Sequence, residues 1–327
     1  MCERELAIGC RHRRPTIHRA YAYTRQTRVK LSCCVIRMSA TIIATALAVA
    51  GPAAVFGLRS IGRVGGLAAA NPAASAVLIT GCSSGIGLAT AQKLSSDGVT
   101  VFATVRKETD ADKIRADNLI PLPCDVTIQD EVQALHAKVE AELQSRPELQ
   151  LTGIVNNAGI LMNDPDGLDI EVLEKILAVN VFGVYRVTQA FLPLLEKLGS
   201  TAHGAARVVT IGSYFGDFIP GSAHLSYGAS KHALEPFSDG LRRRLAPKGV
   251  HVALVKPGNI ATEMNKDFAE ATPDVVADAI SDALFSSAPL TRYYPGTFGG
   301  MPNRVACFLF ASLPDRIADK LWKWKLG

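Results

Sequence analysis

Short β-branched runs alternate with longer amphipathic stretches along most of the chain, from residue 73 to the C-terminus. Short, mostly apolar runs are typical of strands buried on both faces, whereas apolar residues three and four positions apart are typical of helices. The clearest strand-like runs are residues 77–80, 99–104, 151–155, 207–211 and 250–255, and the longest helix-like stretches are residues 171–198 and 232–245. Strands alternating with helices are joined by right-handed crossovers into a parallel sheet. The pattern therefore predicts an α/β fold with a single doubly wound parallel sheet and helices on both faces.

Residues 1–72 do not follow this pattern, and they are interpreted as a basic leader. Residues 1–37 contain eight Arg and one Lys against two Glu, whereas residues 40–58 carry no charge over 19 positions. Nineteen helical residues span about 28 Å, close to the thickness of the hydrocarbon core of a bilayer. The apolar segment 40–58 is therefore a candidate transmembrane anchor. A cleaved targeting peptide, a buried Ala-rich helix and a chain start at Met38 remain alternatives.

Composition and charge place the rest of the chain among ordinary globular proteins. Hydrophobic residues make up 48% of the sequence and charged residues 20%, which excludes a collagen-like, coiled-coil or wholly disordered chain. The whole chain has a formal net charge of +5, and residues 1–37 alone carry +7, so the remaining residues carry −2. This distribution argues against a nucleic acid partner for the body of the protein.

Cysteine and histidine residues do not form the spacing of a metal site or a disulfide framework. Four of the seven cysteines lie in the leader, and the other three, Cys82, Cys124 and Cys307, are far apart and form no CxxC pair. We therefore expect no metal and a reducing compartment for this domain. Together with the leader, this predicts a membrane-associated or organelle-targeted protein whose main domain faces a reducing compartment.

A glycine-rich loop follows the first strand directly and opens a helix. Residues 80–87 read Thr-Gly-Cys-Ser-Ser-Gly-Ile-Gly. Glycines at this place permit a tight turn and let the backbone approach a pyrophosphate, while the helix N-terminus offers N–H donors. The loop therefore predicts a dinucleotide phosphate site, whose candidate residues are Gly81, Ser83, Ser84, Gly85, Ile86 and Gly87.

Further short motifs follow this loop in a fixed order. They are Asp125-Val126, Asn156-Asn157-Ala158-Gly159, Asn180 within Asn-Val-Phe-Gly, Ser213, Tyr227-xxx-Lys231 and Pro257-Gly258-Asn259-Ile260-Ala261-Thr262. Together with the loop, which is similar to TGxxxGIG, they resemble the motifs of the short-chain dehydrogenase/reductase family. The resemblance covers residues 75–327 and implies a Rossmann-type NAD(P)-binding domain over residues 73–327.

Tyr227 and Lys231 are the candidate acid/base pair. They are four positions apart, so on a helix they share one face and can converge on one substrate atom. Hydride transfer between a carbinol carbon and nicotinamide requires the oxygen to lose or gain a proton, and a free phenol with a pKa of about 10 is a poor base near neutrality. An ammonium about 4 Å away favours the phenolate by about 1–4 kcal/mol. We therefore expect Lys231 to lower the pKa of Tyr227.

The resemblance implies the remaining roles. Ser213 would orient the substrate oxygen, Asn180 would complete a water-linked proton path behind Lys231, and Lys231 would also bind the nicotinamide ribose. Asp125 would contact the adenine. The other cofactor-binding residues implied are Val126, Asn157, Ala158 and Gly159, together with Pro257, Gly258, Ile260 and Thr262, which would close over the nicotinamide.

The residues after the second strand favour NADP(H) over NAD(H). Val105 stands where NAD-using relatives place an Asp, and Arg106 and Lys107 come next. A guanidinium can bind the 2′-phosphate through two hydrogen bonds, and the Ser83 hydroxyl is a further donor. The alternative is that Arg106 is a solvated surface cation.

Within this family the sequence most resembles the branch that contains the hydroxysteroid and retinol dehydrogenases. Residues 230–245, 292–294 and 313–316 are similar to it. This resemblance implies an NADP(H)-preferring alcohol dehydrogenase or carbonyl reductase for a lipophilic, steroid-, retinoid- or lipid-like substrate, and a homo-oligomer. A reductase of small hydroxy acids or 3-oxoacyl thioesters and a non-catalytic nucleotide-binding or scaffold protein are the alternatives.

Overall fold

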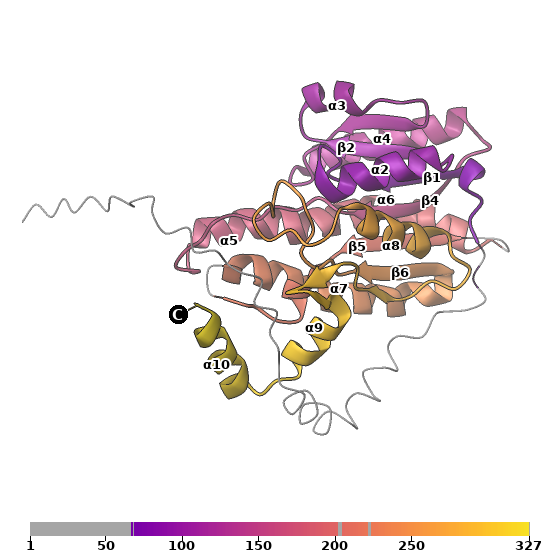
Figure 1. Cartoon of the computed structure of the whole chain (residues 1–327). Coiled ribbons are helices and arrows are strands. Elements are labelled where there is room, and N and C mark those ends of the chain that lie inside the picture. Colours follow the sequence, from indigo (N-terminus) through magenta and orange to yellow (C-terminus); the bar gives the residue numbers. More distant parts are fainter. Residues whose placement is uncertain (1–66, 68, 202–204, 222–223, 327) are drawn as a thin grey trace, which may run out of the picture. The chain divides into compact units, whose positions relative to one another are not determined.

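The structure is a computed structural model that describes residues 67, 69–201, 205–221 and 224–326, the last five without their side chains (Figure 1). Nearly all of the leader, including the candidate anchor 40–58, lies outside the described residues. The description begins in effect at the short helix η2 (Pro72–Ala74), which leads directly into the first strand.

A seven-stranded parallel sheet forms the centre of the described domain. Its strands are β1 (Ser75–Ile79), β2 (Thr100–Val105), β3 (Leu119–Pro123), β4 (Gln150–Asn156), β5 (Ala206–Ile211), β6 (Val250–Val255) and β7 (Arg292–Tyr293). They lie in the order β3-β2-β1-β4-β5-β6-β7, so the winding reverses between β1 and β4. In such sheets the carboxyl ends of the strands at the reversal border the ligand crevice. The predicted doubly wound parallel sheet is confirmed.

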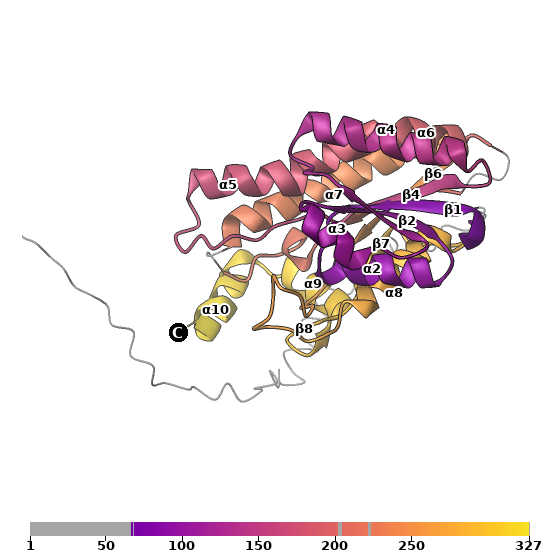
Figure 2. The same ribbon diagram turned by 90° about the horizontal axis from the view of Figure 1, so that it is seen from above.

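Helices cover both faces of the sheet (Figure 2). One face carries α2 (Gly85–Ser96), α3 (Glu108–Ile114) and α8 (Asp274–Phe285), and the other carries α4 (Gln129–Ser145), α6 (Val184–Gly199) and α7 (Leu225–Leu245). Every residue of β1, β2, β5 and β6 is buried, as their continuous apolar runs predict.

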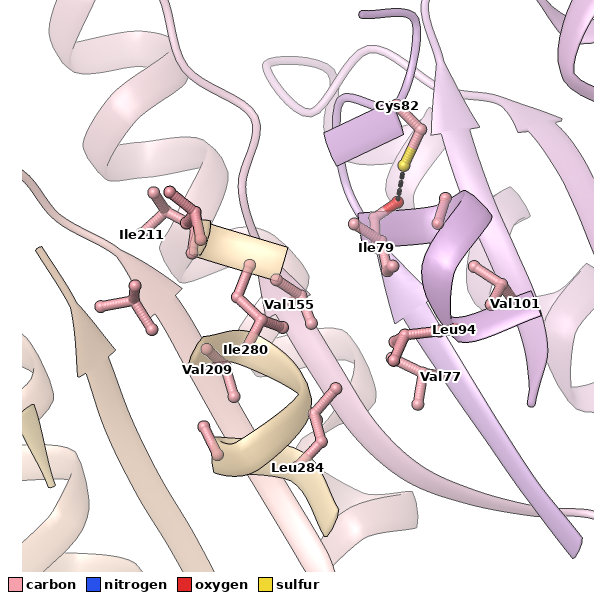
Figure 3. Packing of buried hydrophobic residues seen from close by; sticks show 14 of the residues in the cluster. Val77, Ile79, Cys82, Leu94, Val101, Val155, Val209, Ile211, Ile280 and Leu284 are labelled. Carbon is pink, nitrogen blue, oxygen red and sulfur yellow. Dashed lines mark hydrogen bonds between the residues drawn. The ribbon is translucent and has the colours of Figure 1, made fainter. Parts of the chain in front are cut away.

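Apolar side chains from the strands and the covering helices form a core on each side of the sheet. On the side of α2 and α8, Leu94, Ile280 and Leu284 pack against the sheet (Figure 3). On the other side, residues of α4 and α6, among them Leu135 and Phe191, pack against the same strands. The two cores fix the strand ends from which the candidate site residues project.

The longest helical run described extends from Ile170 to Gly199. It consists of α5 (Ile170–Leu177), the π-helical turn η3 (Ala178–Gly183) and α6. Among the described residues this run alone is long and apolar enough to cross a membrane by length and composition. Half of its most apolar window is buried, and α6 packs on the sheet, so core packing accounts for its apolar character.

The C-terminal part adds a two-stranded hairpin and two helices. The hairpin consists of β8 (Thr297–Phe298) and β9 (Met301–Pro302), and the helices are α9 (Asn303–Ala311) and α10 (Asp315–Leu326). Two short turns, η4 (Tyr214–Gly216) and η6 (Ala246–Lys248), follow β5 and α7. The hairpin and η4 lie at the carboxyl end of the sheet, beside the candidate site.

Candidate active site

The glycine-rich loop connects β1 to α2 in the conformation that its sequence predicts. Gly81 has a φ of +72°, and a side chain at position 87 would collide with the carbonyl oxygen of Gly81. The loop therefore needs glycine for a left-handed turn and for close helix packing. Helix α2 begins at Gly85, so its first-turn N–H groups lack acceptors within the helix and face the end of the loop. Ser83 and Ser84 are exposed, and Ile86 is half-buried against the core.

Hydrogen bonds from the Asn-Asn-Ala-Gly segment hold the loop. The Thr80 hydroxyl accepts from the backbone N–H groups of Asn157 and Ala158 at 3.0 and 2.9 Å. Nδ2 of Asn157 donates to the carbonyl oxygens of Thr80 and Gly81 at 2.8 and 3.0 Å. The Asn157 side chain thus shapes the loop, and Thr80, which the sequence analysis did not single out, is its main partner.

The residues expected at the adenosine end lie around the ends of β2 and β3. Arg106 directly follows β2 and is exposed, as is Lys107. Oδ1 of Asp125 accepts hydrogen bonds from the backbone N–H and the hydroxyl of Thr127 at 2.8 and 2.7 Å. Val126 is buried, and its side chain packs against Gly183. The exposed guanidinium and the half-buried carboxylate leave both groups accessible to a nucleotide.

Ser213, Tyr227 and Lys231 come together at the carboxyl end of the sheet. Ser213 follows β5 and caps η4, and its hydroxyl is hydrogen-bonded to Tyr227, which lies in the first turn of α7. Lys231 is one turn further along α7, and its Nζ lies 5.6 Å from the centre of the Tyr227 ring and donates to the Ile211 carbonyl at 2.9 Å. All three side chains are buried. The structure therefore brings together three residues that the sequence analysis connected only through their motifs.

The pKa of Tyr227 differs from the expectation in direction. Burial raises it to about 12, while the hydrogen bond from Ser213 lowers it. Burial also lowers the pKa of Lys231, to about 8. The predicted lowering by Lys231 is therefore wrong for this structure, because desolvation of the phenolate outweighs the other influences. At neutral pH Tyr227 is a protonated phenol and Lys231 an ammonium.

Asn180 lies in the π-helical turn between α5 and α6 and is fully buried. Its Oδ1 accepts from the backbone N–H of Ile160 at 2.8 Å, and its Nδ2 donates to the Ile160 carbonyl and to the Ser230 hydroxyl, both at 3.0 Å. A side chain added at Gly159 would meet Asn180 Oδ1 and Lys231 Nζ at 3.4 and 3.7 Å. Asn180 thus joins the end of β4 to α7 beside Lys231, and Ser230 is a partner that the sequence did not reveal.

The Pro257–Thr262 segment lies against the phosphate loop and the hairpin. A side chain at Gly85 would come within 3.1 Å of Thr262 Cγ2, and a side chain at Gly258 would collide with the carbonyl oxygen of Thr297. Pro257 and Ile260 are buried, and Thr262 is half-buried. A cleft of about 460 Å³ is lined by Ser84, Gly85 and Thr262 among others, so loop and segment face each other across a gap.

Aromatic side chains cluster around Tyr227. Phe215 meets the Tyr227 ring edge-on at 5.3 Å. Phe218 lies 5.3 Å from Phe298 and 5.0 Å from Phe310 of α9, centre to centre. These residues come from η4 and the loop after it, from the hairpin and from α9, and no local sequence pattern connects them. The sequence therefore indicated a lipophilic substrate only by resemblance, without naming this cluster.

Comparisons with known proteins agree with this geometry. A family model described as short chain dehydrogenase matches residues 75–273. The chain is similar to D-beta-hydroxybutyrate dehydrogenase, mitochondrial, of Bos taurus, with 36% identity over 80% of this chain and 88% of the relative. It is also similar to estradiol 17-beta-dehydrogenase 2 of Mus musculus, with 36% identity over 75% of this chain and 74% of the relative.

Two further proteins extend this agreement. For 11-beta-hydroxysteroid dehydrogenase type 2 of Bos taurus the identity is 32% over 76% of this chain and 71% of the relative. A solved structure of a short chain dehydrogenase from Burkholderia cenocepacia J2315 in complex with NADP has a TM-score of 0.62 and 27% identity. It covers 70% of this chain and 99% of that chain. The same architecture thus recurs in a protein that holds a dinucleotide.

Proposed function

Since this chain belongs to the short-chain dehydrogenase family, we propose that it is an NADP(H)-preferring oxidoreductase that interconverts a lipophilic alcohol and its carbonyl, with Tyr227 as the acid/base. At the coarser level it is an oxidoreductase of the alcohol dehydrogenase type. The observation that carries the proposal is the buried group of Ser213, Tyr227 and Lys231 next to the phosphate loop. A role in catalysis accounts for a lysine that is buried beside a tyrosine at a cost in stability.

The residues of the phosphate loop fit a dinucleotide. A side chain at position 87 would fill the space between α2 and the carbonyl of Gly81, so the close approach of helix and loop depends on glycine there. Gly81, Ser83, Ser84, Gly85 and Ile86 would hold the pyrophosphate through N–H groups, and Asp125, Val126 and Ala158 would line the adenosine end. Lys231 would bind the nicotinamide ribose, and Gly159, Gly258 and Thr262 would border the ring.

The residues after β2 support NADP(H) over NAD(H). Val105 ends β2 in a buried position, where it offers no carboxylate to a ribose hydroxyl, and the exposed Arg106 follows. Arg106 forms no ion pair with the described residues, so its guanidinium is available for a 2′-phosphate, with the exposed Ser83 as a further donor. Replacing Arg106 by Asp tests this preference.

Proton transfer is proposed to occur at the Tyr227 hydroxyl. When bound, the nicotinamide exchanges a hydride with the substrate carbon. In carbonyl reduction Tyr227 gives its proton to the substrate oxygen while Ser213 donates a hydrogen bond that orients it, and in alcohol oxidation the proton moves in the opposite direction. The raised pKa of Tyr227 means that its hydroxyl is protonated at neutral pH, which is the state that carbonyl reduction requires. Lys231 stabilises the phenolate left behind, and Asn180 holds the backbone of Ile160 beside it.

The aromatic cluster supports a lipophilic substrate. The side chains around Tyr227 are apolar or aromatic, among them Phe215, Phe218 and Phe298. A small hydroxy acid is the second candidate, because one similar protein is named D-beta-hydroxybutyrate dehydrogenase. A carboxylate substrate needs a cation beside it, whereas the side chains of Phe215, Phe218 and Phe298 offer apolar surface. The cluster therefore favours a steroid-, retinoid- or lipid-like substrate.

Turnover by the full-length protein tests the proposal. NADPH and NADH oxidation would be followed at 340 nm with steroid, retinoid, small oxo-acid and 3-oxoacyl substrates. The proposal expects the highest kcat/KM with NADPH and an apolar ketone or aldehyde. NADPH binding without turnover over the whole panel would instead support a non-catalytic role, and turnover of only small oxo-acids would refute the lipophilic substrate.

A homo-oligomer is part of the proposal. A groove of about 550 Å³ on the outer surface between α6 and α7 is lined by Tyr185, Leu192, Phe237 and Leu241 among others. Tyr185 is half exposed although its ring packs 4.4 Å from that of Phe237. Contact with a second copy would cover this apolar surface. Light scattering of the purified protein should give a multiple of 34.8 kDa, and a mass of 34.8 kDa at micromolar concentration would refute it.

Membrane attachment through residues 40–58 is proposed on the sequence and on kinship, since the segment lies outside the described residues. It would keep the site near the membrane in which a lipophilic substrate dissolves. After expression of the full-length protein, a membrane anchor should resist carbonate extraction. Complete release into the soluble fraction would refute the anchor and leave the targeting-peptide alternative.

A further inference from the structure

Asn259 connects the segment next to the phosphate loop with the segment that carries Ser213. It is buried, with 7% of its surface exposed, and follows Pro257-Gly258. The Tyr214 hydroxyl lies 3.2 Å from its Oδ1, and Oε1 of Glu270 lies 2.8 Å from its Nδ2. Tyr214 directly follows Ser213, whereas Glu270 belongs to the chain that continues beyond Thr262. One buried amide thus links the segment that carries Ser213 to the chain beyond Thr262.

The direction of these hydrogen bonds is fixed by chemistry. An ionised carboxylate only accepts hydrogen bonds, so the Asn259 amide nitrogen must face Glu270. Oδ1 then faces Tyr214, whose hydroxyl must donate. Burial raises the pKa of Tyr214 well above its ordinary value, so the proton stays in place. Glu270 also accepts from the backbone N–H groups of Gly299 and Gly300 at 2.8 and 3.0 Å.

The backbone of Asn259 is held as firmly as its side chain. Its N–H donates to the Thr297 carbonyl at 2.8 Å, and its carbonyl accepts from the N–H groups of Glu270 and Ala271 at 2.9 and 3.1 Å. Tyr214 is attached to the same segment a second time, through its N–H and the carbonyl of Pro257 at 3.3 Å. The chain after Ser213 is therefore tied to residues 257–271 and, through them, to the hairpin.

We propose that Asn259 is a positioning residue that sets the place of Ser213 relative to Tyr227 through Tyr214, and that Glu270 fixes Asn259 in that orientation. The inference rests on the proposed function, in which Ser213 and Tyr227 hold the substrate oxygen. The hydrogen-bonded row Tyr214–Asn259–Glu270 thereby ties residues 257–271 and the hairpin to the geometry of proton transfer.

Loss of the row should alter the pH dependence of turnover. The groups that face the Tyr227 hydroxyl are Ser213 and Lys231, with the Phe215 ring and Tyr214 nearby. The hydrogen bond from Ser213 lowers the pKa of Tyr227, so a displaced Ser213 would leave it higher. The pH at which alcohol oxidation reaches half its maximum would then move upward, an effect that a loss of overall stability would not produce.

Tyr214→Phe is the mildest test, because it keeps the ring in the aromatic cluster. We expect kcat to fall about threefold to tenfold, the worth of one buried hydrogen bond, and the pH midpoint of oxidation to rise. The KM for NADPH should stay unchanged. Tyr185→Phe, on the outer face of α6, is the matched control and should change neither quantity.

The direction of the hydrogen bonds gives a sharper test. Asn259→Asp sets two carboxylates against each other, and we expect a loss of at least about tenfold in kcat. Glu270→Gln added to this variant supplies an amide donor to the new carboxylate, which still accepts from Tyr214. The amide nitrogen cannot accept from the Gly299 N–H as Oε1 of Glu270 does, so we expect the double variant to regain at least about threefold over Asn259→Asp without reaching the wild type. Glu263→Gln, in the same segment, is the control for the second substitution and should rescue nothing.

Thermal unfolding of each variant separates misfolding from misplacement. The proposal is overturned if correctly folded Tyr214→Phe protein keeps the wild-type kcat and pH midpoint, or if the double variant is no better than Asn259→Asp alone. Absence of turnover in the wild-type protein with every carbonyl would refute the proposed function itself. Normal wild-type turnover with unaffected variants would refute only the role of Asn259.

Discussion

The two walls of the candidate site are built by different kinds of contact. The phosphate-loop wall, residues 80–87 and 156–159, is shaped by backbone groups and by two short motifs, with Thr80 and Asn157 as the main side chains. The aromatic wall, residues 213–219, 257–271 and 294–310, is held by side chains such as Tyr214, Phe218 and Asn259 that meet across long sequence distances.

This difference bears on how each wall responds to change. In the phosphate-loop wall a side chain added at Gly81 or Gly87 would collide with backbone atoms that cannot move away. A substitution there should therefore abolish coenzyme binding and not merely weaken it. In the aromatic wall each contact is one of several around the same ring, and substitutions should produce graded changes in rate or specificity. Variants ranked by expected effect can therefore confirm or break the distinction.

The largest effect should come from Tyr227, which stands where the walls meet. Tyr227→Phe removes the proton donor and keeps the ring, so kcat for carbonyl reduction should fall about 10³-fold or more. NADPH binding, measured by fluorescence, should persist because the phosphate-loop wall is untouched. Tyr185→Phe serves as the control. Wild-type turnover in the Tyr227→Phe protein would show that the acid/base lies elsewhere.

The next largest effect concerns stability at Lys231. Its pKa is about 8 in the folded protein against 10.5 for an ordinary lysine, so burial of the ammonium costs about 3 kcal/mol. Below pH 8 Lys231 is protonated in both the folded and the unfolded state, so the full cost of burying the ammonium lowers the free energy of unfolding. Between pH 8 and 10.5 the unfolded state binds more protons, so the stability of the wild type rises with pH and the cost disappears.

Lys231→Met removes a burial cost of about 3 kcal/mol and also the hydrogen bond to the Ile211 carbonyl, worth about 1 kcal/mol. It should therefore raise the free energy of unfolding at pH 7 by about 2 kcal/mol while abolishing turnover. The advantage over the wild type should shrink steadily from pH 8 to 10.5. Denaturant titrations at pH 7 and pH 10 measure both values. A Lys231→Met protein less stable than the wild type at pH 7 would mean that the ammonium contributes more to folding than its burial costs.

Much of the phosphate-loop wall could be predicted from the sequence because its contacts are local. The glycines, the strand before them and the helix after them occupy one continuous segment, and Asn157 follows the neighbouring strand. Five of the seven strands (β1, β2, β4, β5 and β6) were predictable for the same reason, since each lies in a short, mostly apolar run. Thr80 escaped notice because a threonine at a strand end has no distinctive pattern.

The aromatic wall could not be predicted in the same way. Its members come from η4 and the loop after it, from the hairpin and from α9, and only the tertiary fold brings Phe218, Phe298 and Phe310 together. The pKa of Tyr227 was expected to be lowered, but it is raised. The four-residue spacing shows that the Lys231 ammonium is close, whereas the burial that raises the pKa cannot be inferred from the sequence. Side-chain partners such as Asn259 and Ser230 likewise depend on packing that no local pattern encodes.

A smaller effect is expected at Arg106, at the edge of the phosphate-loop wall. Arg106→Asp replaces a hydrogen-bond donor to the 2′-phosphate by a carboxylate, which carries the same negative charge as that phosphate. The KM for NADPH should therefore rise about tenfold to fiftyfold, while the KM for NADH changes little. Arg115→Asp, an exposed residue just beyond α3, is the matched control for the change in charge. Equal changes with both coenzymes would place Arg106 among solvated surface cations and remove the argument for NADP(H).

The smallest effect should separate the two walls most directly. Phe310 lies 5.0 Å from Phe218 and 5.9 Å from Phe298, so Phe310→Leu loses aromatic contacts that are worth about 0.5–1.5 kcal/mol. We expect kcat/KM for an apolar ketone to fall about twofold to tenfold, with the KM for NADPH and turnover of a small carbonyl unchanged. Phe308→Leu, on the same helix but outside the cluster, is the control. Only a contact with the substrate itself distinguishes one carbonyl compound from another. An equal loss of kcat/KM with small and large substrates would therefore mean that the aromatic wall supports the catalytic residues and does not select the substrate.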